Sequence, residues 1–158
     1  MKTANLTQDL APAVQELMAL GEPYVRVRTD SDYWLYARLF STTCLVALDD
    51  RDLPLAAVIA FRSQDDPGDV YIQDVITHPG ARRTGAASSL ITELAAVAAR
   101  LGCTRLWLTS EPDNTSAHAT WLSLGFINVA GDRTIHGVAV INDFKGPGKH
   151  RSVYERRL

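Results

Sequence analysis

The sequence predicts a single-domain α/β fold, with a mixed central β-sheet flanked by helices on both faces. The length of 158 residues is typical of one domain rather than two. Apolar segments in the first half alternate like strands and predict an antiparallel meander. A strand–helix–strand unit follows, and such a unit brings two strands together in parallel.

The composition excludes several classes of protein. Hydrophobic residues make up 46% and charged residues 22% of the chain, as in ordinary globular domains, which argues against disorder. The longest uncharged apolar runs, residues 39–48 and 53–61, are far shorter than the ~20 residues that span a bilayer. The segment after Met1-Lys2 is polar rather than apolar as in a signal peptide. We therefore expect a cytoplasmic protein that does not bind membranes.

The first third of the chain predicts two helices and two strands. A helix over about Leu10–Leu20 has one apolar stripe, with Thr7 as its N-cap. A second helix is predicted over Asp32–Phe40. Cys44–Leu48 and Leu55–Phe61 lie on either side of an aspartate-rich turn, which predicts an antiparallel pair.

A third strand is predicted over Val70–Thr77. Side chains in a strand alternate between its two faces. One face would carry Tyr71, Gln73, Val75 and Thr77, and the other Val70, Ile72, Asp74 and Ile76. Asp74 would then be the one charged residue on an otherwise apolar face.

The most regular helix of the sequence is predicted over about Gly85–Leu101. A shorter helix, capped by Thr115 or Ser116, would end at Leu124-Gly125. Three more strands are predicted at Arg105–Thr109, Phe126–Val129 and Val153–Arg157. The pattern does not determine residues 130–151, where a strand at Gly137–Ile141 is the one element we expect.

The segment between the third strand and the long helix carries the clearest chemical signal. Residues 82–87 (RRTGAA) are small or basic, and a helix begins among them. The first N–H groups of a helix have no intrahelical partner, and small side chains let a ligand approach them. The helix dipole and two arginines add positive potential. This combination predicts an anion site, most naturally for a phosphate or pyrophosphate.

Other nucleotide and metal motifs are absent from the sequence. Gly85 stands alone, so there is no G-x-G-x-x-G, and His150 follows Gly148-Lys149 where a P-loop requires serine or threonine. Cys44 and Cys103 are far apart in apolar surroundings, which predicts buried free thiols rather than a metal or redox site.

The anion loop resembles that of a known family. Arg82-x-x-Gly85-x-Ala87 matches the Q/R-x-x-G-x-G/A pyrophosphate loop of the GNAT acyltransferase superfamily. Asn114-x-x-Ala117, followed by Trp121-x-x-x-Gly125-Phe126, is similar to that family's N-x-x-A…Y-x-x-x-G-F segment. The similarity is strong over residues 44–129. It implies a GNAT-like domain over residues 1–158, with acetyl-CoA as cosubstrate.

The resemblance also implies which residues bind acetyl-CoA. The strand edge would pair with the pantetheine arm like an added strand, and an asparagine side chain would hydrogen-bond the same arm. The backbone of residues 83–88 would hold the pyrophosphate, and two arginines would supply positive charge. The expected residues are Val75, Ile76, Thr77, Arg82, Arg83, Thr84, Gly85, Ala86, Ala87, Ser88 and Asn114.

Acetyl transfer to an amine requires that the amine lose a proton. An amine with a pKa of about 10.4 is neutral about once in 2,500 molecules at pH 7, so the site must accept a proton and also stabilise an oxyanion. A backbone N–H near Val75–Ile76 is the expected oxyanion donor. Asp74 is the first candidate to handle the amine, by attracting its charge or removing its proton through water, and Glu111 is the second. The alternative is a purely structural Asp74, bonded to neighbouring backbone.

Trp121 departs from the family pattern, because many relatives have a tyrosine there that acts as general acid. An indole N–H cannot donate a proton in this way. Tyr154 is the candidate substitute, although a thiolate with a pKa near 8.5 is a tolerable leaving group without an acid. We expect Tyr33, Trp34, Asp74 and Trp121 to line the acceptor pocket, with packing in the core as the alternative for the aromatic residues.

Together these features predict an N-acetyltransferase that moves an acetyl group from acetyl-CoA to a primary amine of a small cationic acceptor, by direct attack in a ternary complex. Net charges of −6 over residues 1–80 and +4 over residues 81–158 favour that acceptor. A protein N-terminus or lysine is an alternative acceptor, and a catalytically weak acyl-CoA-binding or sensing protein is an alternative function. The net charge of −2 argues against nucleic-acid binding. A homodimer is compatible with the sequence, which identifies neither the acceptor nor the oligomeric state.

Overall fold

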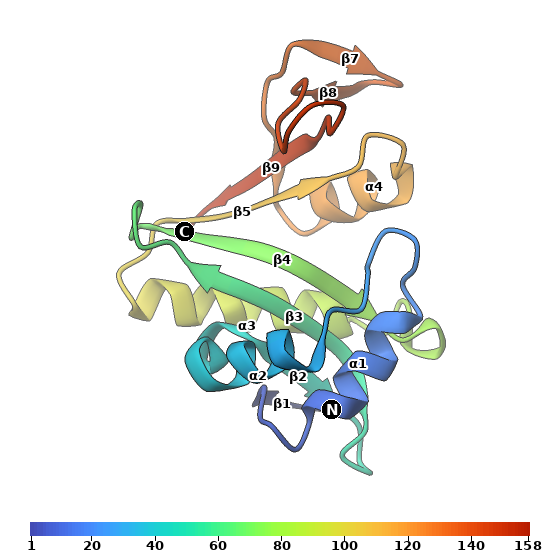
Figure 1. The fold of residues 1–158 in the computed structure, drawn as a ribbon, viewed down its shortest axis with the longest axis vertical. Coiled ribbons are helices and arrows are strands. Elements are labelled where there is room, and N and C mark those ends of the chain that lie inside the picture. Colours follow the sequence, from blue (N-terminus) through green and yellow to red (C-terminus); the bar gives the residue numbers. More distant parts are fainter.

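In the computed structural model, which describes residues 1–158, seven strands form one sheet in the order β1-β2-β3-β4-β5-β9-β6 (Figure 1). Only β4 and β5 run parallel; every other neighbouring pair is antiparallel. The strands are β1 (Lys2–Asn5), β2 (Leu45–Leu48), β3 (Pro54–Arg62), β4 (Asp69–Thr77), β5 (Arg105–Ser110), β6 (Ile127–Asn128) and β9 (Ser152–Arg157). The mixed sheet that the sequence predicts is confirmed.

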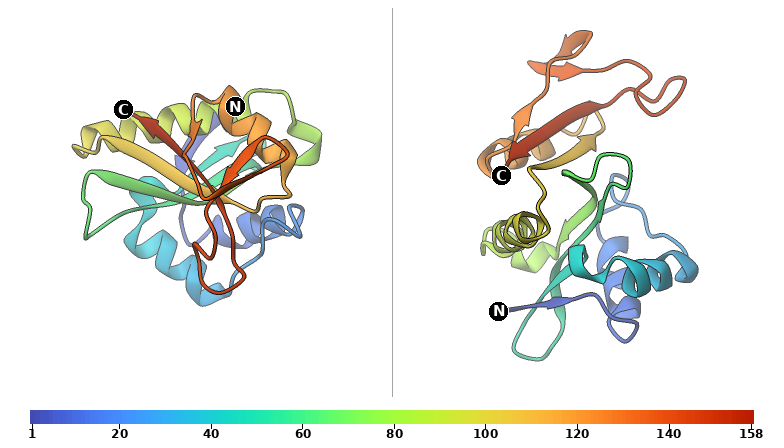
Figure 2. Two further views of the ribbon diagram at one scale, coloured as in Figure 1. Left: turned by 90° about the horizontal axis from the view of Figure 1, so that it is seen from above. Right: turned by 90° about the vertical axis from the view of Figure 1, so that its left-hand side faces the viewer.

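The sheet separates two hydrophobic cores. Helices α1 (Ala11–Ala19) and α2 (Asp30–Leu39) cover one face, and α3 (Ala86–Arg100) covers the other, as Figure 2 shows. α3 buries Leu90, Ile91 and Leu94 completely, because these residues form one apolar stripe. A fourth helix, α4 (Thr115–Ser123), lies beyond the end of β5. No helix is both long enough and apolar enough to cross a membrane.

The helix starts differ from the predicted ones in ways that capping explains. α2 begins at Asp30 because Thr29 and Asp32 form a capping box, in which each side chain accepts a hydrogen bond from the other residue's backbone N–H. α4 is capped by Asn114, not by Thr115 or Ser116: the Asn114 Oδ1 accepts from the Ala117 N–H at 3.2 Å. Thr7 does not cap α1 itself; its Oγ1 accepts from the Leu10 N–H, one turn earlier.

A β-bulge in β4 corrects the predicted alternation of its side chains. Ile59 pairs with Asp74, but the next residue of β3 pairs with Ile72, so Gln73 is an extra residue. Ile72 therefore packs in the core under α3, while Asp74 and Ile76 face the core under α1 and α2. Burial still alternates along the whole strand, which is why the pattern did not predict the bulge.

Residues 130–151 contain a structure that the sequence predicted only in part. A two-stranded hairpin of β7 (Arg133–Ile135) and β8 (Val138–Val140) packs beside β9, and an ordered loop returns the chain to β9. β8 corresponds to the strand predicted at Gly137–Ile141, whereas β7 was not predicted. Strand β1 was also missed, because its sequence KTAN carries almost no apolar pattern.

Candidate active site

β4 and β5 separate halfway along their length. Their pairing ends at Ile72 and Leu108; β4 then continues with β3 alone as far as Thr77, and β5 with β9 (Figure 1). The His78 N–H donates to the Leu55 oxygen of β3 at 2.7 Å. Because backbone direction alternates along an antiparallel strand, the N–H and C=O groups of Val75 and Thr77 point away from β3. This free edge lies where the sequence predicts pairing with a pantetheine arm.

The chain after this edge turns through a short 3₁₀ segment, η2 (Pro79–Ala81), into α3. Arg83 and Gly85 both have left-handed backbone, with φ of 63° and 85°. The first bond of the helix is from the Ser89 N–H to the Gly85 oxygen at 2.9 Å, and the N–H groups of residues 86–88 have no backbone partner. No atom lies within 4 Å of a Cβ placed on Gly85. A ligand can therefore reach three donors at the positive end of the helix.

Two hollows meet where β4 and β5 separate. The loop-side hollow, of about 640 Å³, is bounded by the β4 edge, residues 81–88 and α4. The Asp74-side hollow, of about 500 Å³, is bounded by residues 24–28, the bulge of β4, the end of β5 and residues 145–151. Six residues line both hollows: Tyr24, Val25, Val75, Asn114, Ala117 and Trp121. A molecule in one hollow can thus touch a molecule in the other.

The loop-side hollow gathers the residues predicted to bind acetyl-CoA. All of them line it except Thr84, whose hydroxyl instead donates to the Ala81 oxygen at 2.5 Å and braces the loop. Asn114 uses its Oδ1 to cap α4, which leaves its Nδ2 as the group that can donate to a ligand.

Asp74 lines the second hollow with a nearly buried carboxyl group. It is 8% exposed, and its Oδ2 has no hydrogen-bond partner. Burial raises the pKa of Asp74, while Arg28, whose Nε lies 3.7 Å from Oδ2, and Lys145 act in the opposite direction. A buried carboxylate with a raised pKa and no hydrogen bond to Oδ2 is suited to accept a proton. Glu111 lines the same hollow.

The aromatic residues of α2 do not line either hollow. Tyr33 is 1% exposed and packs behind Asp74; burial first and the Asp74 charge second raise its pKa to about 12. Trp34 is 52% exposed on the outer face of the helix. Neighbouring residues in a helix point about 100° apart, so Tyr33 can face the core while Trp34 points outward. The two residues expected to line the acceptor pocket therefore line neither of these hollows.

Trp121 and Tyr154 occupy different environments. Trp121 lines both hollows and packs edge-on against Phe126, with ring centroids 5.3 Å apart. Tyr154 lines neither hollow: it is 1% exposed, and its hydroxyl lies 2.7 Å from the Nδ1 of His118. The structure does not bring Tyr154 to the place where its predicted role as acid would require it.

Sequence reasoning missed the cations of the Asp74-side hollow. Arg26 and Arg28 precede α2, and Lys145, Lys149 and Arg151 belong to the loop before β9. These two segments meet only in the folded chain. The glycine-rich, basic character of residues 145–151 is the one feature of the sequence that could have drawn notice to them.

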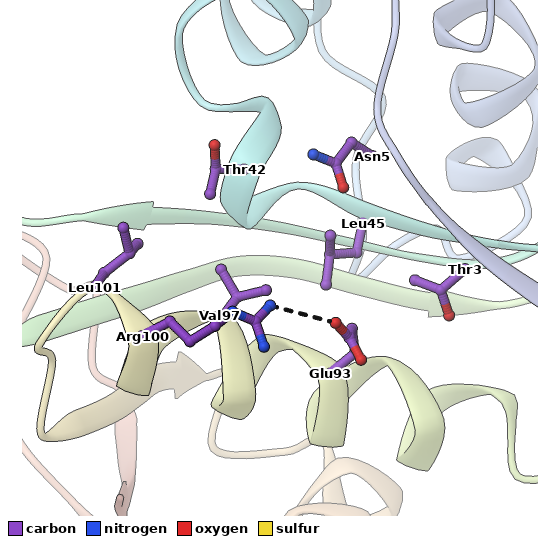
Figure 3. A pocket seen from close by; sticks show the side chains of 8 residues that line it. All are labelled: Thr3, Asn5, Thr42, Leu45, Glu93, Val97, Arg100 and Leu101. Carbon is purple, nitrogen blue, oxygen red and sulfur yellow. Dashed lines mark ion pairs between the residues drawn. The ribbon is translucent and has the colours of Figure 1, made fainter.

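A third hollow, of about 390 Å³, lies between the C-terminal half of α3 and the edge of the sheet at β1 and β2 (Figure 3). Thr3, Asn5 and Thr42 line it, together with an ion pair between Glu93 and Arg100 at 3.6 Å. It shares no residue with the other two hollows.

Known proteins share a family signature and the fold with this chain. The sequence matches the acetyltransferase (GNAT) family over residues 12–126, and no curated protein matches it. Solved structures share the fold. One is the diaminobutyrate acetyltransferase of Paenibacillus lautus, in complex with L-2,4-diaminobutyric acid and coenzyme A; it is 19% identical, with a TM-score of 0.75 over 98% of this chain and 92% of that chain.

Two further solved structures contain other ligands. Naa20 of Chaetomium thermophilum, bound to a bisubstrate analogue, is 16% identical, with a TM-score of 0.78 over 100% of this chain and 87% of that chain. A putative acetyltransferase of Salmonella typhimurium, yncA, with acetyl-CoA, is 15% identical, with a TM-score of 0.76 over 100% of this chain and 94% of that chain. Identities this low show a shared fold and do not determine the acceptor.

Proposed function

Because the chain belongs to the acetyltransferase (GNAT) family, we propose that it transfers the acetyl group of acetyl-CoA to the primary amine of a small acceptor. The sequence predicts a small cationic acceptor, and the protonated amine supplies a positive charge of this kind. Acetyl-CoA occupies the loop-side hollow, the acceptor occupies the Asp74-side hollow, and the amine attacks the thioester directly. Neither Cys44 nor Cys103 lines a hollow, so neither is placed to carry the acetyl group.

Backbone groups hold acetyl-CoA in this proposal. The N–H groups of residues 86–88 bind the diphosphate, and Arg82 and Arg83 add positive charge beside it. The backbone of Val75 and Thr77 pairs with the amide groups of the pantetheine arm, as a neighbouring strand would. The unpaired edge of β4 and the unpaired helix donors support this placement, because both face the same hollow.

The observation that carries the proposal is the buried Asp74 carboxylate, whose Oδ2 accepts no hydrogen bond, beside the free strand edge. The amine reaches the site as an ammonium ion and gives a proton to Asp74, directly or through a water molecule. Its nitrogen lone pair then attacks the thioester carbon, while the Val75 N–H donates to the developing oxyanion. The C–N bond forms, the C–S bond breaks, and coenzyme A leaves as a thiolate. The nitrogen then loses its second proton to this thiolate or to solvent water, which leaves a neutral amide.

No general acid is needed for this departure, since a thiolate is a stable leaving group. Trp121, which stands where relatives have the acidic tyrosine, packs beside the thioester and helps to exclude water. Tyr154 is buried against His118, away from both hollows, which does not support a role as the proton donor.

The proposal is tested by measuring thiol release from acetyl-CoA with a panel of amines. The Cys44 and Cys103 thiols are buried, so a thiol reagent reports chiefly the coenzyme A that is produced. Steady release that depends on an added amine supports the proposal. Trp121 stands where the family pattern has tyrosine, and this difference favours one alternative function, that of an acyl-CoA-binding or sensing protein. Acetyl-CoA that raises the melting temperature without any amine-dependent thiol release would establish that alternative and overturn the proposal.

A further inference from the structure

We propose that the acceptor carries an anionic group, a carboxylate or a phosphate, in addition to the amine that Asp74 receives. This inference rests on the proposed function, because it concerns the acceptor of the same reaction. Its basis is the charge of the Asp74-side hollow. Five cationic side chains line that hollow, against the two carboxylates of Asp74 and Glu111. The cations are Arg26, Arg28, Lys145, Lys149 and Arg151.

Four of these five cations form no ion pair within the protein. The fifth, Arg28, lies 3.7 Å from Asp74. Lys145 donates to the Tyr71 hydroxyl at 2.9 Å and Arg151 to the His150 oxygen at 2.7 Å, both uncharged acceptors. The whole chain has a net charge of −2, so an excess of three cations in one hollow is a local concentration of charge.

The loop that supplies three of the cations is held in place by its own hydrogen bonds. The Asp143 Oδ1 accepts from the Gly148 N–H at 2.7 Å, and the Asp143 N–H donates to the His150 Nδ1 at 2.9 Å. The Lys145 N–H donates to the Lys149 oxygen at 3.1 Å. The basic side chains therefore project from a defined turn, and they meet Arg26 and Arg28 from a distant part of the sequence at a single hollow.

A purely cationic amine would meet like charges at this site. Both Arg28 and Lys145 already act on the Asp74 carboxylate, as their effect on its pKa shows. An ammonium group that approaches Asp74 comes near these two cations as well. A carboxylate or phosphate elsewhere on the acceptor offsets that repulsion and binds the guanidinium and ammonium groups at the rim. The sequence predicts a cationic acceptor from the net charges of its two halves, and these totals do not show where Arg26 and Arg28 lie.

The test compares acceptors that differ only in the anionic group. A set of amino acids is assayed against their own amides, and 2-aminoethyl phosphate against ethanolamine. We expect kcat/KM to be about 10–100-fold higher for the charged member, the range that one charge-assisted hydrogen bond gives. The preference should shrink as salt is added. The larger of the carboxylate and phosphate preferences identifies the anion.

Substitutions of the cations test whether these side chains cause the preference for an anionic acceptor. Lys145→Gln and Arg151→Gln should each lower the ratio of kcat/KM between acid and amide, whereas a loss of fold would lower both values together. Arg38→Gln, on the exposed side of α2 and outside both hollows, is the control and should leave the ratio as it is. Melting temperatures confirm that each variant is folded.

The possible failures are distinguishable. Amines acetylated equally well with and without the anionic group would overturn this inference and leave the proposed function standing. Peptides that are preferred whatever their charge would also overturn it. If no amine released thiol, the proposed function would fail, and this inference with it.

Discussion

The loop-side and Asp74-side hollows are built on different principles. The loop-side hollow is made chiefly from one continuous stretch, residues 75–88, and presents backbone groups of a strand edge and a helix terminus. The Asp74-side hollow is made from side chains of four segments that are far apart in the sequence. A backbone-built site tolerates many side chains but needs a particular local geometry. A site built from side chains can change its ligand through single substitutions, which suits a common donor and a variable acceptor.

The largest expected effect separates the two carboxylates of the Asp74-side hollow. Asp74→Asn should lower kcat/KM for amines by about 10²–10⁴-fold, the usual contribution of a general base, without weakening acetyl-CoA binding. Glu111→Gln is the matched variant and should cost much less, because Glu111 lines the same hollow but is only half-buried. Steady-state kinetics with both variants decide the matter. Wild-type kinetics in Asp74→Asn would end its proposed role.

The same substitution should affect stability in the opposite direction. Burial raises the pKa of Asp74, so the folded protein binds this proton more tightly than the unfolded chain does. Stability linked to this group is present below the ordinary aspartate pKa of about 3.9 and is lost as the pH rises through the raised pKa. Asp74→Asn should therefore raise the melting temperature at pH 7. Asp74→Asn should also remove the fall of kcat/KM at acidic pH. In the unmodified enzyme this fall should occur at a pH above the ordinary aspartate pKa, because the pKa of Asp74 is raised.

The second effect tests the backbone-built hollow. Acetyl-CoA at 100 times its Kd should stabilise the protein by about 2.7 kcal/mol, and Gly85→Glu should abolish the resulting shift in melting temperature. The new carboxylate would lie among the helix donors meant for the diphosphate. Gly102→Glu is the control: Gly102 follows the other end of α3, also has left-handed backbone (φ 81°), and also has no atom within 4 Å of an added Cβ. It should lower stability by a similar amount and keep the shift. An intact shift in Gly85→Glu would contradict the assignment of the loop.

The smallest expected effects are those of substitutions at Trp121 and Tyr154, which test whether the enzyme uses a general acid. Trp121→Tyr and Tyr154→Phe should both change kcat by far less than the 10²–10⁴-fold that loss of a general acid costs. Tyr154 lies outside both hollows, so removal of its hydroxyl should chiefly lower stability through the lost bond to His118. A collapse of kcat in Tyr154→Phe, with the melting temperature unchanged, would restore the role of acid that the sequence suggested.

The sequence predicted the backbone-built hollow better than the hollow built from side chains. The strand that ends at Thr77, the loop at residues 82–85 and α3 have strong local patterns, and all lie where they were predicted. The bulge at Gln73 was not predictable because burial alternates on both sides of it, and it alone decides which core Asp74 faces. β1 forms because β2 offers it a partner, not because its own residues favour a strand.

The acceptor side was predicted least well. Asp74 was found because a charged residue interrupts an apolar strand. Tyr33 and Trp34, the two expected pocket residues of α2, line neither hollow, because one points into the core and the other outward. The cations at residues 145–151 belong to a loop without hydrophobic periodicity, and their meeting with Arg28 depends on the whole topology. Charge totals over each half of the chain could not locate them.

The central claim is that acetyl-CoA lies along the free edge of β4, with its diphosphate on the first turn of α3. A crystal structure of the protein with coenzyme A tests it most directly. We predict diphosphate oxygens about 3 Å from the backbone nitrogens of residues 86–88, and pantetheine amides paired with Val75 and Thr77. Coenzyme A bound elsewhere, for example in the hollow between β1 and the C-terminal half of α3, with the β4 edge left empty, would contradict the account.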